Sequence, residues 1–478
     1  MEKTNARYNR TMLVAVVILS AFVTMLNQTI LSVAQPSIID AFKVDLSTVQ
    51  WLSTGYSLIG GILIPISAWM ADRFNTKWLV SSALGIFFIG SVVAAFSGDF
   101  TVLLVGRLLQ AVGGGVLNGL TMTILFSVYP KENRGTPTTL LGLVFGIAPA
   151  VGPTLGGYLV DNLGWHSIFG IVAPVVGLAF VLGLFFMADV VPHKATKLDF
   201  WSVVFSTVGF GGVLYGASMV SDYGWTDVHT LLPGLVGFVV VGLFIWRQLV
   251  IDDPMLNLKV FTSGNFTVAA IISAITQISM VAVEFVLPVY LQNARDLTAF
   301  QSGLTLLPGA VVMFLLAPLS GQLVQKNKGK QIVIFGIIVM ALSTLLLSRL
   351  TLTTPIWELV AIYALRNMGL AFAMMPAGTL GMQGLTPDLI SHGSAANNVV
   401  RQVGAAIGTA VLVSVMQSKA TASSPSASLL KTDPAAYGHG MHLALVAGAQ
   451  ASLIIATIIG VVGVGFALAL KQPKKNAA

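Results

Sequence analysis

Fourteen apolar stretches, each long enough to cross a lipid bilayer, fill this chain, and almost every charged residue falls between them. A spanning helix needs about 20 mostly apolar residues, so fourteen such helices and short loops use nearly all 478 positions. Charged residues make up only 9% of the chain, compared with roughly 25% in soluble domains. The sequence therefore predicts an all-α polytopic membrane protein with 14 transmembrane helices and excludes a water-soluble fold.

The predicted spans are separated by short polar or charged segments. We place them at residues 11–33, 49–71, 78–96, 100–128, 138–160, 166–187, 200–220, 231–250, 265–291, 301–324, 331–348, 355–383, 393–417 and 442–470. The first run follows Lys3, Arg7 and Arg10, as a cleavable signal does. It is long for a signal and holds the polar Asn27-Gln28-Thr29, so we expect a retained first helix.

The net charge of +7 is a topology signal. If the N-terminus is inside, the outer loops hold only Lys43, Arg295, Arg349, Lys419 and Lys431, and the other loop cations lie inside. Lys and Arg are enriched in cytoplasmic loops. We therefore expect both termini in the cytoplasm, and we expect no nucleic-acid partner.

The chain repeats itself weakly but in register. A Pro-x-Ser-small-x-x-x pattern that leads into a basic loop occurs at 65–77 and again at 318–330. Other pairs at a similar spacing are Pro36 with Pro288, Gly152 with Gly404, Gly156 with Gly408, and Arg107 with Arg366. The repeat predicts two copies of a six-helix unit.

The repeat divides the chain into an N-terminal six-helix bundle at 1–190, two inserted linker helices at 191–262 and a C-terminal six-helix bundle at 263–478. Parallel repeats of this kind are a transporter architecture, with the substrate site between the halves near the bilayer midplane. The long hydrophilic stretch at 418–441 is rich in Ser, Ala, Thr and Pro. We expect it to be a poorly ordered outer loop.

Three motifs resemble those of the major facilitator superfamily, and in particular its fourteen-span drug:proton antiporter branch. The segment after span two, Ala68-Trp-Met-Ala-Asp72-Arg73-Phe-Asn-Thr-Lys77, is similar to the superfamily's motif A, although Ala68, Asn75 and Thr76 depart from the pattern. Span four carries Arg107-Leu-Leu-Gln110, similar to motif B, and span five carries Gly152-Pro153-Thr-Leu-Gly156-Gly157, similar to the antiporter motif C. The resemblance covers essentially the whole chain and implies export by exchange.

Span one narrows the resemblance to the lincomycin-resistance exporters, which share the form Leu26-Asn27-Gln28-Thr29. The branch usually has an acid where this chain has Asn27. Because an amide does not titrate, Asn27 is not expected to carry protons, although it can still form hydrogen bonds.

Four charged side chains fall well inside spans, away from the span ends, namely Arg107, Glu284, Arg366 and Arg401. An ionisable residue inside a membrane is a functional-site hypothesis by default. Glu284 is the only acid among them, and burial favours the neutral form of a carboxyl group. One hypothesis makes Glu284 the proton carrier, with Arg107 and Arg366 as coupling cations. The alternative is a structural pair between Glu284 and Arg366.

Span depth and repeat position predict an apolar substrate cleft with few polar groups. The candidate substrate-binding residues are Met25, Asn27, Gln28, Tyr56, Gln110, Asn118, Gln277, Met280, Met374 and Met375. Ordinary packing is the alternative role for each methionine. The candidate gating residues are Asp72, Arg73, Lys77, Gly152, Pro153, Gly156, Gly157 and Arg401, with helix packing as the alternative for the glycines and for Arg401.

These features predict a proton-coupled multidrug exporter of lipophilic or cationic drugs in a bacterial cytoplasmic membrane, working by alternating access. A lipid or glycolipid flippase, a passive facilitator and a membrane enzyme are the alternatives. Cysteine is absent, and no phosphate-binding Gly-x-x-x-x-Gly-Lys-Ser/Thr loop occurs. We therefore expect protons as the coupling ion, no cofactor or metal, small-molecule drugs and lipid as partners, and a monomer.

Overall fold

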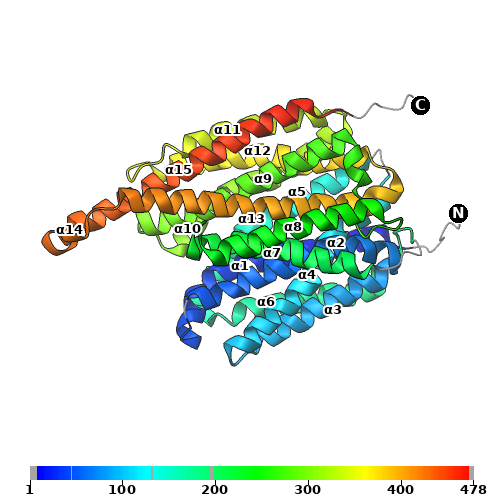
Figure 1. Ribbon diagram of the computed structural model, residues 1–478, viewed down its shortest axis with the longest axis horizontal. Helices are drawn as coiled ribbons and strands as arrows, with labels where there is room; N and C mark the ends of the chain where they lie inside the picture. The colour runs from blue at the N-terminus through cyan, green and yellow to red at the C-terminus, as the bar shows by residue number, and fades with distance from the viewer. Residues whose placement is uncertain (1–7, 45, 131–132, 194–198, 473–478) are drawn as a thin grey trace.

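The computed structural model describes residues 8–44, 46–130, 133–193 and 199–472. In that part of the chain, fourteen helices are long and apolar enough to cross a membrane. Figure 1 shows them lying roughly side by side along the long axis of the molecule. The predicted all-α architecture with fourteen spans is confirmed.

The first half comprises α1 (Arg10–Phe42), α2 (Leu46–Arg73), α3 (Thr76–Ala95), α4 (Phe100–Val128), α5 (Gly135–Leu163) and α6 (Ser167–Phe186), followed by α7 (Phe200–Tyr223) and α8 (Val228–Val250). The second half comprises α9 (Gly264–Val289), α10 (Ala299–Gln325), α11 (Gly329–Leu347), α12 (Ile356–Gln383), α13 (Ile390–Ser423), the short α14 (Ala427–Thr432) and α15 (Pro434–Ala469). The other described helical elements are two short 3-10 helices, η2 (Leu258–Thr262) and η4 (Pro387–Leu389), and a short π-helix, η3 (Tyr290–Ala294).

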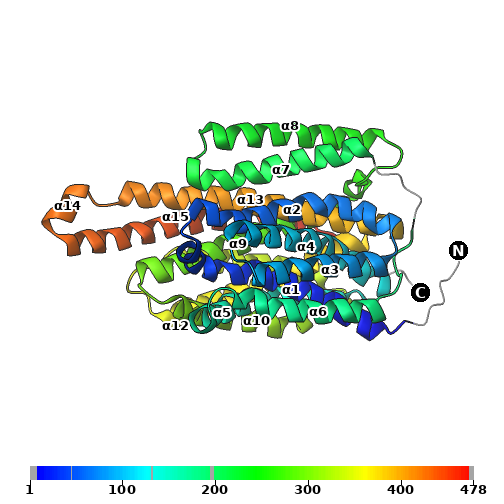
Figure 2. The same ribbon diagram turned by 90° about the horizontal axis from the view of Figure 1, so that it is seen from below.

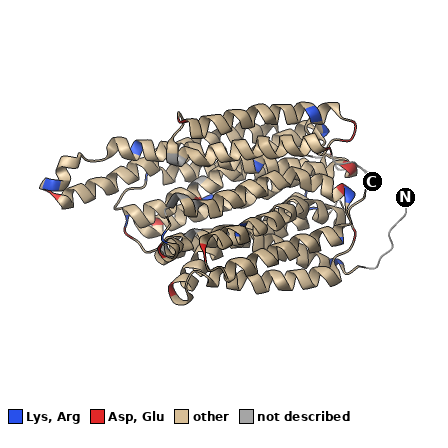
Figure 3. Cartoon of the chain, turned by 60° about the horizontal axis from the view of Figure 1, so that its bottom comes forward, with Lys and Arg blue, Asp and Glu red and all other residues tan. Residues whose placement is uncertain are grey.

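The helices form two bundles. In the first bundle α1 packs on α5 and α6, and α4 packs on α2 and α3. In the second, α9 packs on α12, α13 and α15, and α11 packs on α12 and α15. We name the end where α1 begins and α15 finishes the terminal end, and the end that carries α14 the hairpin end. Figure 3 shows charged residues mainly toward these two ends, with few along the helices between them.

Glycine allows close contact at matching places in both bundles. A Cβ added at Gly90 of α3 would lie 2.7 Å from the backbone nitrogen of Gln110 on α4. The matching pair in the second bundle is Gly336 of α11 and Gly369 of α12, where an added Cβ on either would lie 2.6 Å from the carbonyl oxygen of the other. Small residues are favoured between membrane helices because they let backbones approach.

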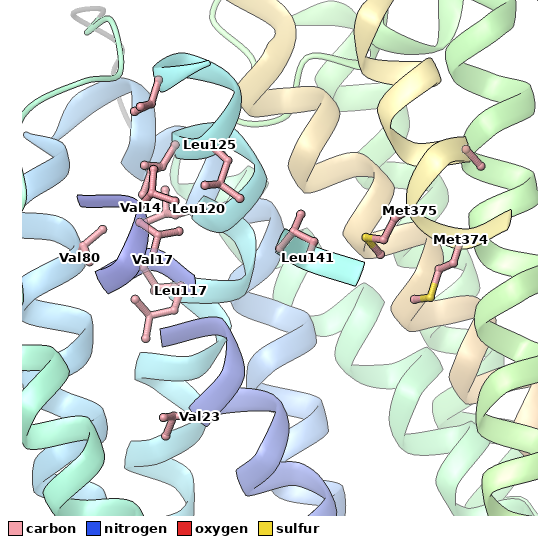
Figure 4. Packing of buried hydrophobic residues seen from close by; sticks show 14 of the residues in the cluster. Val14, Val17, Val23, Val80, Leu117, Leu120, Leu125, Leu141, Met374 and Met375 are labelled. Carbon is pink, nitrogen blue, oxygen red and sulfur yellow. The ribbon is translucent and has the colours of Figure 1, made fainter. Parts of the chain in front are cut away.

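Apolar side chains fill the interior of each bundle. Figure 4 shows Val14, Val17 and Val23 of α1 near Leu117, Leu120 and Leu125 of α4, and these residues belong to one buried cluster. Lipid tails are as apolar as leucine, so close van der Waals packing holds these helices together.

The inserted pair α7–α8 forms a hairpin along one side of the bundles (Figure 2). Helix α7 packs against α2 of the first bundle and α13 of the second, so it covers the seam between them. At the terminal end Arg247 of α8 donates two hydrogen bonds to Asp199, which also caps α7 by accepting from the backbone N–H of Ser202. The hydrogen bonds from Arg247 hold the pKa of Asp199 well below its usual range.

Replacing Asp199 by Asn is expected to lower the unfolding midpoint of the protein in detergent at pH 7, through a loss of about 1–2 kcal/mol, because Arg247 loses a charged partner. A carboxyl whose pKa is lower in the folded chain stabilises the fold above its unfolded pKa, and this contribution is lost as the pH falls through the folded pKa. The difference between wild type and variant should therefore shrink below about pH 4. Thermal unfolding at pH 7 and pH 3 measures this difference in midpoint. Asp252→Asn, at an exposed position, is the control. A pH-independent difference would contradict the assignment.

The expectation of a poorly ordered loop at 418–441 is wrong. Helix α13 runs to Ser423, α14 occupies Ala427–Thr432, and α15 starts at Pro434, so this segment is a helical hairpin that projects beyond the other helices (Figure 2). Asp433 caps α15 by accepting from the backbone N–H of Ala436. The segment is rich in alanine, the strongest helix former, so the helices continue past their apolar spans.

Candidate functional site

A cavity of about 120 Å³ lies between the two bundles. Its walls come from α1, α2, α4 and α5 of the first bundle and from α9, α12 and α13 of the second. The polar side chains that line it are Gln28, Asn118, Gln277, Asn398, Arg401 and Gln402, and the apolar ones include Met25, Met122, Phe145 and Met375. The cavity thus joins amides and one guanidinium with flexible or aromatic apolar groups.

Part of the predicted substrate set lines this cavity. Met25, Gln28, Asn118, Gln277 and Met375 do so. Tyr56 lines a smaller cavity of about 20 Å³, which shares Gln28, Asn118, Gln402 and Ile64 with the larger one.

Asn398 and Gln402 were missed by sequence reasoning as pocket residues. Both belong to the Asn-x-x-Arg-Gln segment in the first half of α13, and both reach the first bundle. The side chain of Asn398 donates to the carbonyl oxygen of Asn118 at 3.2 Å, and that of Gln402 donates to the carbonyl oxygen of Ser57 at 3.4 Å. For Asn398 the signal that could have found it is its position one helical turn before Arg401; for Gln402 no such spacing exists.

Arg401 also lines the cavity, although the sequence placed it at a gate. Its Nε and Nη2 atoms donate to the same amide oxygen, Oε1 of Gln277, at 3.3 and 2.8 Å. Its guanidinium carbon lies 5.0 Å from the centre of the Phe145 ring, which belongs to α5 of the other bundle. Arg401 therefore contacts both halves of the molecule at the cavity.

A separate polar network lies within the first bundle, outside the lining of the larger cavity. Arg107 Nη1 donates to Gln110 Oε1 at 2.9 Å and to the carbonyl oxygen of Asn27 at 3.4 Å, and its guanidinium carbon lies 4.7 Å from the ring centre of Tyr56. The Asn27 amide donates to Gln110 Oε1 at 3.2 Å, and Gln110 donates to Ser91. Arg107 therefore links α4 to a backbone carbonyl of α1.

Arg366 occupies the matching position in the second bundle. Its Nη2 donates to the carbonyl oxygen of Ser279 at 2.5 Å and to the Ser279 hydroxyl at 3.1 Å. Asn27 and Ser279 are separated by as many residues as Pro36 and Pro288. Both buried arginines thus bind a carbonyl of the equivalent residue in the equivalent helix, and the internal repeat is visible in the contacts themselves.

Glu284 lies on α9 seven residues after Gln277. Seven residues are two helical turns, so Glu284 lies on the same face of α9 as Gln277, about 10.5 Å closer to the hairpin end. This face is partly exposed at 277, 281, 284 and 288, while Met280, Val283 and Val286 beside it are buried. Glu284 and Arg366 interact electrostatically, but among the described residues they form no ion pair within 4 Å. Met280 and Met374 lie in the buried core of the second bundle rather than along the cavity; Figure 4 shows Met374 on α12 next to Met375.

Asp72 links the two bundles at the terminal end. It lies in the last turn of α2, it is only 4% exposed, and it accepts a hydrogen bond from the Ser391 hydroxyl of the second bundle at 2.9 Å. Its other carboxylate oxygen lies 3.2 Å from Nε2 of His392. Arg73 is exposed, and Lys77 lies over the Trp78 ring at the start of α3.

Three further contacts cross between the bundles in the same half of the molecule. The hydroxyls of Thr138 and Thr379 lie 2.5 Å apart. Ser394 donates to the carbonyl oxygen of Gly119, and Arg134 donates to that of Met382. Together with Asp72 these residues hold the terminal half of the molecule closed between α2, α4 and α5 on one side and α12 and α13 on the other.

The motif C glycines pack α5 against α1 inside the first bundle. A Cβ added at Gly156 would lie 2.9 Å from a side-chain carbon of Ile30, and one at Gly152 would collide with the Thr29 hydroxyl. Gly157 has ordinary space beside Val33, and Pro153 lies half-buried between these glycines.

A second set of glycines on α5, which sequence reasoning missed, faces the other bundle. Gly142 and Gly146 approach Ala317 and Phe314 of α10, and an added Cβ would lie 3.0 and 3.1 Å from their nearest atoms. Gly135 lies against the Gly321 carbonyl. The seam between α5 and α10 is therefore closely packed along its length.

The described residues contain no group of three or more His, Cys, Asp or Glu side chains that could hold a metal ion. Chemically, the site offers hydrogen bonding, one cation and apolar contact between two halves.

Comparison with known proteins gives consistent matches. A family model described as the Major Facilitator Superfamily matches residues 17–409. The MFS-type transporter YcnB of Bacillus subtilis is 40% identical, over 98% of this chain and 97% of its own. The lincomycin resistance protein LmrB of Listeria innocua is 34% identical, over 97% of each chain. The crystal structure of the human organic anion transporter MFSD10 matches with a TM-score of 0.68 over 96% of this chain and 99% of that one; at 13% identity, this match concerns the fold alone.

Proposed function

Because the chain belongs to the Major Facilitator Superfamily, a family of transporters rather than enzymes, we propose that it exports lipophilic drugs in exchange for protons. Lincosamides are included in the proposal because LmrB, which is named for lincomycin resistance, is similar along nearly its whole length. One chain supplies both halves of the cavity, and we expect it to act as a monomer.

The observation that carries this proposal is the cavity between the bundles. Its walls come from both halves and combine amides, methionines and an aromatic ring. Methionine is flexible and polarizable, which suits a surface that must adapt to different drugs. A site between two repeats serves alternating access, because rocking one bundle against the other exposes it to each side in turn.

Glu284 is our candidate for the proton carrier. It is the one acid among the four ionisable residues predicted inside spans, and it lies on the same face of α9 as the cavity residue Gln277. Arg366, which is hydrogen-bonded to Ser279 and electrostatically coupled to Glu284, is positioned to stabilise the deprotonated acid. Arg107 has the matching structural role in the first bundle.

The terminal end is proposed to face the cytoplasm of a bacterial cell. Its described basic residues are Arg10, Arg73, Lys77, Arg134, Arg247, Lys259, Lys326, Lys328, Lys330 and Lys471, more than the hairpin end carries. Cytoplasmic loops are enriched in Lys and Arg. The contacts around Asp72 would then close the cytoplasmic side, and breaking them would open the cavity to the cell interior.

Because Asp72 helps to close the terminal end, replacing it by Ala is expected to favour opening of that end. Loss of the acceptor for Ser391 and of the partner for His392 should shift the equilibrium toward cytoplasmic opening by roughly tenfold to a hundredfold. A single Ser394→Cys in this cysteine-free chain reports the shift, because Ser394 is only 1% exposed. In everted vesicles, a membrane-impermeant maleimide should label it faster with Asp72→Ala than with the exposed control Asp253→Ala. Equal labelling rates would contradict the role given to Asp72.

The flippase alternative needs a lateral path for lipid into the cavity. Both seams between the bundles are occupied, one by α7 across α2 and α13, the other by the close packing of α5 on α10. This arrangement favours export of water-accessible drugs over lipid flipping.

Transport assays in everted vesicles test the proposal. An imposed pH gradient should drive uptake of lincomycin into vesicles that contain the protein, and an uncoupler should abolish it. Equilibration without dependence on the gradient would indicate a passive facilitator, and flipping of fluorescent lipid without drug uptake would indicate the flippase; either result would overturn the proposal.

A further inference from the structure

We propose that the central cavity selects substrates that present oxygen acceptors and rejects permanent cations, with Arg401 as the specificity-determining residue. The inference rests on the proposed function only in taking this cavity as the place where substrate binds. It makes that substrate neutral or anionic, in contrast to the cationic drugs that sequence reasoning included.

The first observation is that, among the described residues, Arg401 is the only charged group that lines the cavity. A guanidinium has five N–H donors, and its two hydrogen bonds in the described part of the molecule both go to Oε1 of Gln277. Gln277 is neutral, so the positive charge is solvated by an amide and by the Phe145 ring rather than cancelled. No described carboxylate lies within ion-pair distance of it. The remaining N–H groups are left for a guest.

The second observation concerns the neighbouring amide. Because both bonds from Arg401 occupy Oε1 of Gln277, the free polar atom of that side chain is its NH₂ group, which only donates. The cavity wall formed by α9 and α13 therefore offers donors at two adjacent side chains. An oxygen of a carbonyl, hydroxyl or carboxylate group satisfies both.

The third observation is the charge balance around the cavity. The helices that form it carry three buried or half-buried arginines, Arg107, Arg366 and Arg401. Glu284 is the one acid predicted well inside these spans. It lies two helical turns from Gln277, and its carboxyl group interacts electrostatically with Arg366. The lining of the cavity therefore carries the positive charge of Arg401 with no carboxylate beside it. Charge repulsion in an environment of intermediate dielectric weakens binding of a permanent cation by about tenfold or more.

Equilibrium binding to the purified full-length protein tests the proposal independently of proton coupling. The probes are tetraphenylphosphonium, a permanent cation; chloramphenicol, which is uncharged and carries an amide carbonyl and hydroxyls; and fluorescein, which carries a carboxylate. We expect chloramphenicol or fluorescein to bind at least about tenfold more tightly than tetraphenylphosphonium. Comparing the affinities of chloramphenicol and fluorescein shows whether the cavity prefers a neutral or an anionic acceptor. Tighter binding of tetraphenylphosphonium, equal binding of all three, or binding of none would overturn the proposal.

Variants at position 401 test whether this residue sets the preference. Arg401→Gln should remove it, and Arg401→Glu should reverse it in favour of tetraphenylphosphonium. Arg401→Lys keeps the positive charge and should still reject the cation. Arg349→Gln, which removes one positive charge at an exposed position, is the matched control and should bind like wild type. An unchanged ranking in Arg401→Gln would overturn the assignment. Thermal unfolding shows which variants fold. If Arg401→Gln does not fold, the ranking of the three probes by affinity in wild type and in Arg401→Lys still tests the proposal.

The two proposals fail in different ways. Absence of flux driven by a pH gradient for every substrate would overturn proton-coupled export and leave the binding preference intact. Proton-driven flux of tetraphenylphosphonium as fast as that of chloramphenicol would overturn the selectivity proposal and leave proton-coupled export intact.

Discussion

Replacement of Glu284 by Gln is expected to abolish drug accumulation driven by a pH gradient or membrane potential. Glutamine has nearly the shape of glutamate but does not exchange a proton near neutral pH. One proton moving across 100 mV supplies about 2.3 kcal/mol, which sustains a drug concentration ratio of about 50-fold. In everted vesicles the ratio should fall from this order in wild type to about 1 in the variant.

The same variant should retain exchange of labelled for unlabelled drug across the membrane, because that reaction needs the cavity and the rocking motion but no net proton movement. This separates loss of coupling from loss of folding. Glu358→Gln, at the start of α12 near the hairpin end, is the control and should accumulate drug like wild type. Undiminished drug/proton exchange in Glu284→Gln would leave Glu284 with only the structural role beside Arg366.

A disulfide between positions 138 and 379 is expected to stop transport completely. The two threonine hydroxyls lie 2.5 Å apart across the bundles, close to the length of a disulfide bond, about 2.05 Å. Because the chain has no cysteine, Thr138→Cys with Thr379→Cys gives one defined pair. Oxidation should lock the terminal half closed, and reduction should restore drug flux in the same vesicles.

The matched control is a pair that does not cross the bundles. Thr351→Cys with Thr354→Cys lies in the loop between α11 and α12 of the second bundle, where the two hydroxyls are 3.1 Å apart, and should transport drug whether oxidised or reduced. Full transport by the 138–379 pair, with the bond verified by mass spectrometry, would rule out opening of the terminal side as a step of the cycle.

The sequence located these sites along the chain more reliably than in space. Asn27, Gln110 and Met374 were placed in the cleft because they lie at the right depth in their spans. In the structure Asn27 and Gln110 bond to Arg107 inside the first bundle, and Met374 is buried in the second. Depth follows from residue number, but which face of a helix borders the cavity depends on how neighbouring helices cross it.

Arg401 illustrates the same limit. Its motif marked it as important, and position along the chain put it near the end of a span. Only the packed structure brings it against Gln277 of α9 and Phe145 of α5. The carboxylate of Asp72 likewise belongs to a recognisable motif, but its partners Ser391 and His392 are more than 300 residues away and carry no local signal.

The sequence by itself determined the fourteen spans, the repeat and the family resemblance, because each apolar helix must satisfy its own backbone in lipid and so carries its signal within about 20 residues. Tertiary structure alone decided which glycines of α5 face α10 and which polar groups meet in the cavity. Those outcomes depend on contacts between helices distant in the chain, and hydropathy contains no information about them.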